Sequence, residues 1–312
     1  MDVPQWNCVL WVMLAAAAMP ALGQSLAPAS GPANTGDTQS ASSIPDFSGI
    51  WAHLTWPDFE PPLAAPGPVT NRARRDGASD AYQLIGDYTN SILKPQAAEV
   101  VKKHGEISLT GVTYPTPSNQ RWPGGVPFVI FNIGMQMLQQ PDKITILYSN
   151  DHEVRHVRLS QPHPAHVTPS WYGDSVGHCE GDTLVIDTVG IKIGPFAMVD
   201  MYGTPHSPAL HVVERYRLLD YEAAKQAEER GQRGLSRFGR DPGLARNPGY
   251  KGKGLQLEFT VEDDGVFTKP WSAAVSYRRP LGEWPEMVCA ENPNEYFHAR
   301  RTAVPMADKP DF

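Results

Sequence analysis

The alternation of apolar and polar positions predicts a chain built mainly from β-strands. Residues 143–149 (KITILYS) alternate with a period of two, and residues 154–159 (VRHVRL) do so again after Asn150 and Asp151. Alternation of this length is typical of half-buried strands, and a polar pair between two such runs favours a hairpin. Apolar or β-branched runs predict further strands at 126–138 (interrupted at 132–134), 183–189, 211–218, 254–261, 273–277 and 286–289.

Residues 171–190 (WYGDSVGHCEGDTLVIDTVG) predict two strands around a tight turn at Glu180-Gly181-Asp182. Glycine adopts positive φ at little cost, and an aspartate in a turn bonds nearby backbone amides. Helical patterns are few. One covers 94–104 and opens at Pro95, and the other covers 221–232, which is rich in Ala, Glu and Lys.

These elements predict an all-β, mainly antiparallel fold with a few short helices. Strands at this spacing form a barrel-like sheet or a sandwich, and a lipocalin-like barrel is one such form. We expect a single β-rich domain at 44–297 and a polar tail at 298–312, because the chain has no second linker and no internal repeat. Trp51 and Trp271 are expected to be ordinary core residues.

The N-terminal residues predict export. Residues 1–23 contain a short apolar run and a small-residue exit at Ala21-Leu22-Gly23, the layout of a signal peptide. No Lys or Arg precedes the run, so a buried N-terminal helix is the alternative. Residues 24–43 are rich in Ala, Ser, Pro, Gly and Thr and are expected to form a disordered leader. The mature protein is therefore expected to be periplasmic or secreted.

The charge balance argues against some partners. A net charge of −7 does not favour nucleic acid or an anionic membrane surface, and no other segment predicts a membrane span. The oligomeric state stays open. Outside the signal peptide the cysteines are Cys179 and Cys289, which either form one disulfide in an oxidising compartment or remain separate thiols.

A literal H-E-x-x-H motif occurs at His152–His156. In a zinc protease this motif lies on a helix, where both imidazoles reach one metal ion. Here it lies in a predicted hairpin, where two histidines four residues apart on a strand are about 13 Å apart. We therefore do not expect a zinc protease.

The candidate site is expected in the Pro/Gly-rich loops beside the strands, where functional residues are commonly placed on a rigid scaffold. Glu214 and Arg215 point to opposite faces of one strand, so one of them is expected inside the barrel. A buried charge must be paired or functional, and His with carboxylates can perform acid–base chemistry near neutral pH. We predict catalytic roles for His163, His178, His206 and Glu214, and substrate contacts for Trp171, Tyr172, Asp174 and Arg215. We expect the three histidines to approach one cavity.

Several blocks of the sequence carry a resemblance. They are DFSGIW near the start, WPGGVP at 122–127, His163-Pro164, the run from Gly173 to Thr188, TPHS at 204–207, LHVVERY at 210–216, TKPW at 268–271, and Glu286 with CAEN at 289–292. With them the chain resembles a large family of exported, mostly uncharacterised bacterial proteins with the signature G-x-S-x-G-x-x-E-G-D-T-L-V-x-D-T. The resemblance implies one β-rich exported domain and supplies no catalytic roles.

Three hypotheses about function follow. The first is a lyase, isomerase or hydrolase that acts on a small, partly apolar or aromatic molecule through His and Asp/Glu, with no organic cofactor. The second is a periplasmic ligand-binding protein without chemistry, as in lipocalin-type barrels. The third is a metal-dependent enzyme that uses a His cluster. Convergence of the predicted histidines in one cavity would favour an enzyme, and their scatter would favour the ligand-binding protein.

Overall fold

The structure is a computed structural model, and all the residues that it describes lie in one compact unit, Ser42–Phe312. The described residues are 45–280, 294–295 and 300–301, except for gaps at 54–58, 61, 63–65, 76–77, 81–82, 112–113, 121, 150–152, 233–246 and 248. The predicted signal peptide, the predicted leader at 24–43, the strand at 286–289 and Cys289 lie outside them. Among the described residues Cys179 is in no disulfide.

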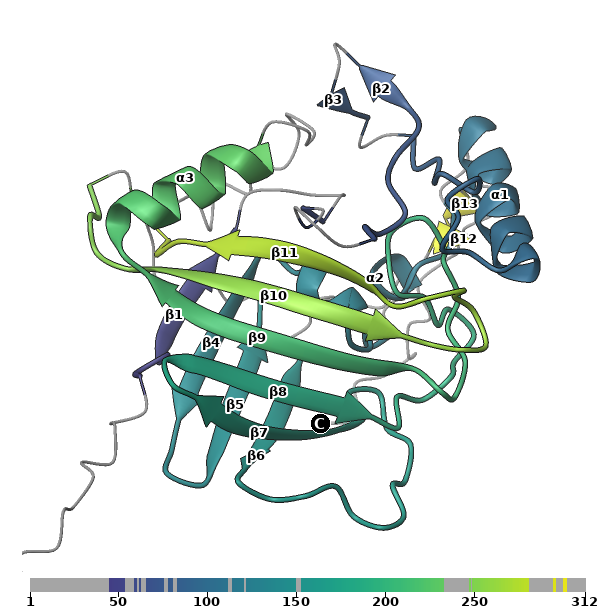
Figure 1. Cartoon of the computed structure of the whole chain (residues 1–312). Helices are drawn as coiled ribbons and strands as arrows, with labels where there is room; N and C mark the ends of the chain where they lie inside the picture. Colours follow the sequence, from purple (N-terminus) through teal and green to yellow (C-terminus); the bar gives the residue numbers. More distant parts are fainter. Residues whose placement is uncertain are drawn as a thin grey trace, which may run out of the picture. The chain divides into compact units, whose positions relative to one another are not determined.

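A nine-stranded, nearly closed, barrel-shaped sheet dominates the structure (Figure 1). Its strands follow one another in chain order: β1 (Gly49–Ala52), β4 (Gly134–Gln139), β5 (Lys143–Tyr148), β6 (Val154–Leu159), β7 (Asp174–Glu180), β8 (Thr183–Val189), β9 (His211–Leu219), β10 (Gly254–Glu262) and β11 (Trp271–Tyr277). All neighbours are antiparallel except β6 and β7. The predicted all-β, mainly antiparallel, barrel-like fold is thus confirmed.

The barrel closes where its first and last strands meet. Ala52 of β1 and Arg278, directly after β11, exchange two backbone hydrogen bonds of 2.8 Å. The alternate positions of each strand that face inward carry the core, and Trp51 and Trp271 are both 1% exposed, as predicted. Large side chains of the described strands therefore occupy the inner face.

The remaining elements are short. Two small sheets pair β2 (Arg74–Arg75) with β3 (Ala78–Ser79) and β12 (Asn294–Glu295) with β13 (Arg300–Arg301). The helices are α1 (Pro95–Leu109), α2 (Pro117–Gln120) and α3 (Tyr221–Gln232). None of the described helices has the length and apolar character to cross a membrane.

Most strands begin and end where the apolar pattern placed them. The hairpin of β5 and β6 and the strand at 183–189 are confirmed, and the helix at 94–104 extends to Leu109. The first half of the predicted strand 126–138 is wrong, because Phe128–Phe131 forms a 3₁₀ turn. All four of its side chains are buried, so a continuous apolar run gives no period that separates a strand from a buried turn.

Candidate functional site

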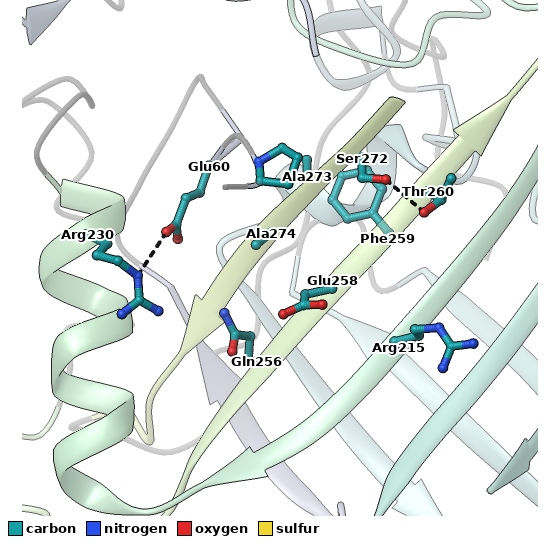
Figure 2. A pocket seen from close by; sticks show the side chains of 11 residues that line it. Glu60, Arg215, Arg230, Gln256, Glu258, Phe259, Thr260, Ser272, Ala273 and Ala274 are labelled. Atoms are coloured by element: carbon teal, nitrogen blue, oxygen red, sulfur yellow. Dashed lines mark hydrogen bonds and ion pairs between the residues drawn. The ribbon is translucent and has the colours of Figure 1, made fainter. Parts of the chain in front are cut away.

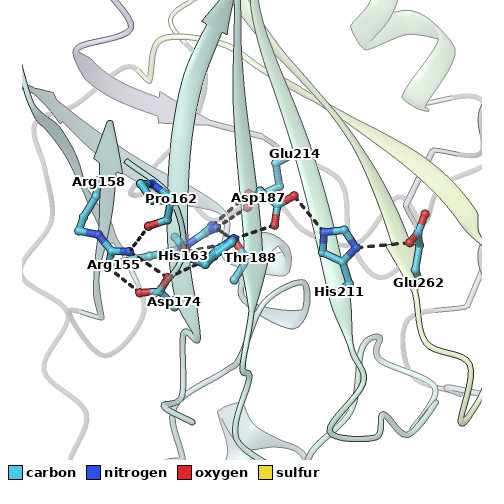
Figure 3. Close-up of polar contacts among 11 residues, drawn as sticks. Arg155, Arg158, Pro162, His163, Asp174, Asp187, Thr188, His211, Glu214 and Glu262 are labelled. Carbon is cyan, nitrogen blue, oxygen red and sulfur yellow. Dashed lines mark hydrogen bonds and ion pairs between the residues drawn. The ribbon is translucent and has the colours of Figure 1, made fainter. Parts of the chain in front are cut away.

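A line of charged side chains crosses the outer face of five neighbouring strands (Figure 3). Because side chains alternate along a strand, Asp174 on β7, Asp187 on β8 and His211 on β9 all point away from the core. Glu262 lies directly across from His211 on β10. We call this line, completed by Arg158 of β6 and His163 of the following loop, the outer network.

Asp187 is the centre of the outer network. Its Oδ1 is 3.0 Å from Nε2 of His163, and its Oδ2 is 3.0 Å from Nε2 of His211. The second nitrogen of each imidazole also meets a carboxylate, at 2.6 Å for His163 Nδ1 and Asp174, and at 3.3 Å for His211 Nδ1 and Glu262. Each imidazole therefore has a carboxylate at both of its nitrogens, and for His211 this arrangement favours the imidazolium, in which both nitrogens donate.

Arg158 anchors one end of the outer network. Its guanidinium donates to both oxygens of Asp174, at 2.5 and 3.0 Å, in the fork geometry that suits a carboxylate. When both imidazoles are protonated, Arg158, His163 and His211 balance the three carboxylates. The outer network therefore has no net charge only when both of its histidines carry a proton on each ring nitrogen.

The pKa values follow from these contacts. Hydrogen bonds from His211 and then His163 lower the pKa of Asp187, although partial burial opposes the shift. The Arg158 guanidinium is the main cause that lowers the pKa of Asp174. The hydrogen bond to Asp187 raises the pKa of His211 above its ordinary value of 6.5, and Glu262 adds to that shift. His211 thus keeps its proton to a higher pH than a free histidine does.

Glu214 lies on the other side of the same sheet. It is 0% exposed and receives hydrogen bonds from Arg155 at 2.5 and 3.1 Å and from Tyr216 at 2.8 Å. The remaining donors of Arg155 reach the hydroxyls of Ser175, Tyr148 and Thr188. All five guanidinium donors are therefore used. One member of the pair of Glu214 and Arg215 lies inside, as the alternation predicted, and that member is Glu214, which is enclosed among core residues.

The predicted histidines do not share one cavity, so that expectation is wrong. His163 belongs to the outer network, and His178 is exposed and contacts Glu180, which also accepts from Arg215 at 2.7 Å. His206 lies with Trp171 in a small aromatic cluster that includes Trp122 and Phe196. Strand parity separates Glu214 from the predicted histidines on the barrel wall, because Glu214 faces inward while His178 faces outward.

Of the predicted substrate-binding residues, Asp174 forms a hydrogen bond with His163, and Trp171 lines the same small pocket as His206. Trp171 packs against Trp122 with ring centroids 5.3 Å apart, and Tyr172 stacks on Tyr148 at 6.3 Å. Arg215 lies on the outer face beside a pocket described below. The structure therefore distributes Trp171, Tyr172, Asp174 and Arg215 over separate contacts.

The H-E-x-x-H motif lies in a hairpin, as predicted, although His152 is outside the described residues. His156 is exposed on β6, and its Nδ1 is 3.2 Å from the hydroxyl of Thr145. The carboxylate of Glu153 accepts a hydrogen bond of 2.9 Å from the backbone amide of Gly124. Among the described residues, no three His, Cys, Asp or Glu side chains are grouped so as to hold a metal ion.

A pocket of about 350 Å³ lies on the outer face of β9–β11 (Figure 2). Its floor is formed by outward residues of β10 and β11, and one wall is Arg230 of α3. Glu60 forms another wall, because its backbone pairs with Ala274 at the free edge of β11. This volume falls within the range of small-molecule sites.

Sequence reasoning did not select four members of the outer network as site residues: Asp187, His211, Arg158 and Glu262. The signal was present in their parity, since each occupies an outward position of its strand. It became visible only with the order and register of the strands, which align Glu262 with His211. No protein-family model matches the chain, and neither the curated proteins nor the solved structures include a significant match.

Proposed function

We propose that the protein is an exported enzyme that processes a small, partly apolar molecule by acid–base chemistry, as a lyase, isomerase or hydrolase without an organic cofactor. The observation that carries the proposal is the carboxylate of Asp187, which holds one nitrogen of each of two half-buried imidazoles at 3.0 Å. A carboxylate that fixes one imidazole nitrogen orients the other for a reacting group, and for His211 that group would have to displace Glu262, which lies 3.3 Å away.

His211 is the proton donor in this proposal. Its Nε2–H stays on Asp187, while its Nδ1–H faces Glu262 across 3.3 Å, the longest of the four contacts between histidine and carboxylate in the outer network. Glu262 is also the most exposed of the three carboxylates, at 49%. A substrate oxygen that takes the place of Glu262 would receive the proton from Nδ1, and the neutral imidazole would then act as the base.

His163 acts as a positioning residue. It connects Asp187 to Asp174 and thereby to the forked contact with Arg158. This contact limits the rotation of the Asp187 carboxylate, which must keep its second oxygen on His211.

The test is an incubation of the purified protein with a small-molecule extract, followed by mass spectrometry. A hydrolase adds the mass of water, a lyase gives fragments whose masses sum to that of the substrate, and an isomerase gives equal mass with changed retention. We expect turnover that falls at least about 100-fold in His211→Asn. His178→Ala, which removes an exposed histidine outside the outer network, is expected to keep the rate.

The pH profile gives a second criterion. The active form of His211 is protonated, and its pKa is raised from 6.5, so the rate should remain level through pH 6.5 and fall only at higher pH. Activity should also be lost at acid pH, where Asp187 is protonated. Because the pKa of Asp187 is lowered, this loss should occur below pH 3.8, the ordinary pKa of an aspartate. Absence of turnover, or full activity in a folded His211→Asn variant, would refute the proposal.

A ligand-binding protein without chemistry is the second candidate. It is favoured by the scatter of the predicted histidines and by the pocket on β9–β11, whose described lining contains no histidine. In that case the extract would yield bound ligand without product.

A further inference from the structure

The pocket on β9–β11 is lined by both acidic and basic side chains, and some of them form ion pairs while others do not. Arg215 and Glu258 are direct neighbours across β9 and β10, yet Arg215 donates to Glu180 at 2.7 Å. Among the described residues, no basic side chain forms an ion pair with Glu258, which lies exposed on the floor between Gln256 and Thr260 (Figure 2). Within the described part of the chain, the floor therefore presents a carboxylate that has no ion-pair partner.

The second carboxyl group of the pocket is only loosely compensated. Glu60 is 16% exposed, and its Oε1 lies 3.6 Å from Nε of Arg230, beyond the usual length of a charged hydrogen bond. Burial raises the pKa of Glu60, Arg230 opposes this shift, and the charge of Glu258 adds to it. Two carboxyl groups thus face one cavity, and a positive charge placed there would stabilise both of them.

The rest of the lining suits hydroxyl groups. Thr260 and Ser272 lie across from each other on β10 and β11, with their oxygens 2.9 Å apart, and each hydroxyl can still bond a ligand. Ala274 adds an apolar part of the floor, against which the C–H groups of a ligand can pack. Because the cavity is about 350 Å³, it accepts a molecule the size of a hexose.

We propose that this pocket binds a small hydroxylated amine of the amino-sugar class, with its ammonium group held between Glu258 and Glu60. An anionic ligand would meet the carboxylate of Glu258, and both arginines of the described lining already contact glutamates. A neutral sugar would keep the hydroxyl contacts but leave the negative charge unpaired. The site rests on the pocket alone and is separate from the acid–base chemistry of the outer network.

Three probes of one size separate these classes: D-glucosamine, D-glucose and D-glucuronate, titrated into the purified protein by calorimetry at pH 7 and low ionic strength. We expect glucosamine to bind at least about tenfold more tightly than glucose, and glucuronate to bind least. Glu258→Gln should remove the preference for glucosamine with little effect on folding, because the side chain is exposed.

The matched control is Glu229→Gln, which removes the same charge from an exposed position on α3 beside Arg230 but outside the described lining. It should bind glucosamine as the unmodified protein does. His211→Asn should also retain binding, so a failure of the enzyme proposal is distinguishable from a failure of this one. Equal binding of glucosamine and glucose, no binding of any probe, or unchanged binding in Glu258→Gln would overturn the proposal.

Discussion

At the scale of residues, the direction of a side chain decides its chemistry. Glu214 and Arg215 are adjacent in the chain, but Glu214 is fully buried and Arg215 is 46% exposed. Burial of a charge is costly, and Glu214 is tolerated because Arg155 and Tyr216 supply three hydrogen bonds. The ion pair of Arg155 and Glu214 is therefore part of the core, while Arg215 forms an ion pair with Glu180 on the outer surface.

We expect Glu214→Gln to destabilise the protein by about 3 kcal/mol or more, because it leaves the buried guanidinium of Arg155 without a counter-charge. The matched control is Arg215→Gln, which breaks an exposed ion pair with Glu180 and should cost less than about 1 kcal/mol. Urea unfolding followed by tryptophan fluorescence measures both. Similar midpoints for the two variants would mean that the hydroxyls around Arg155 suffice to hold its charge.

At the scale of elements, the sequence was most informative where side chains alternate. The strand at 183–189 and the helix at 221–232 agree with the structure to the residue. The 3₁₀ turn at 128–131 was missed because it is apolar throughout. The site was missed for a different reason: Asp187 and His211 meet through the pairing of β8 with β9, and pairing between strands is long-range information that local alternation does not contain.

The connection between β6 and β7 is the element that brings His163 to the site. These strands are parallel, so the chain must cross from one end of the sheet to the other through residues 160–173. The crossover starts at Ser160, which has a φ of 55°, and His163 attaches it to Asp174 and Asp187. The imidazole of His163, together with the hydrogen bond from Arg158 to the carbonyl of Pro162 at 3.3 Å, therefore connects this loop to the outer network.

His163→Ala should loosen this crossover. We expect hydrogen exchange of peptides within 161–173 to accelerate by about tenfold, which corresponds to about 1.4 kcal/mol of local stability. His166→Ala is the control, since His166 lies exposed in the same loop and has no polar contact among the described residues. If both variants exchange at the same rate, the loop is held by its backbone and His163 is dispensable for its order.

At the scale of the whole barrel, the short seam between its first and last strands is the place where closure depends on few contacts. Next to the pair of Ala52 and Arg278, the guanidinium of Arg279 donates to the carbonyls of Ile50 and Ser48 at 3.0 Å each. It also lies 3.7 Å from the centre of the Trp51 ring. Gly49 makes room for it, because a Cβ there would be 2.0 Å from Nη1 of Arg279.

Arg279→Ala should therefore open the seam. Two charged hydrogen bonds and a cation–π contact are lost together, and we expect about 2–4 kcal/mol of destabilisation. Arg279→Lys keeps the charge but cannot span both carbonyls with a planar fork. Its stability should therefore lie between that of Arg279→Ala and that of the unmodified protein. Urea unfolding gives the energies, and hydrogen exchange of 48–52 locates the change.

Because β1 is held on its other side by four residue pairs with β4, exchange should rise first at β1 and leave β8–β10 protected. A uniform rise over all strands would mean that the seam opens only with global unfolding, and unchanged exchange at β1 would mean that the backbone pair of Ala52 and Arg278 closes the barrel alone.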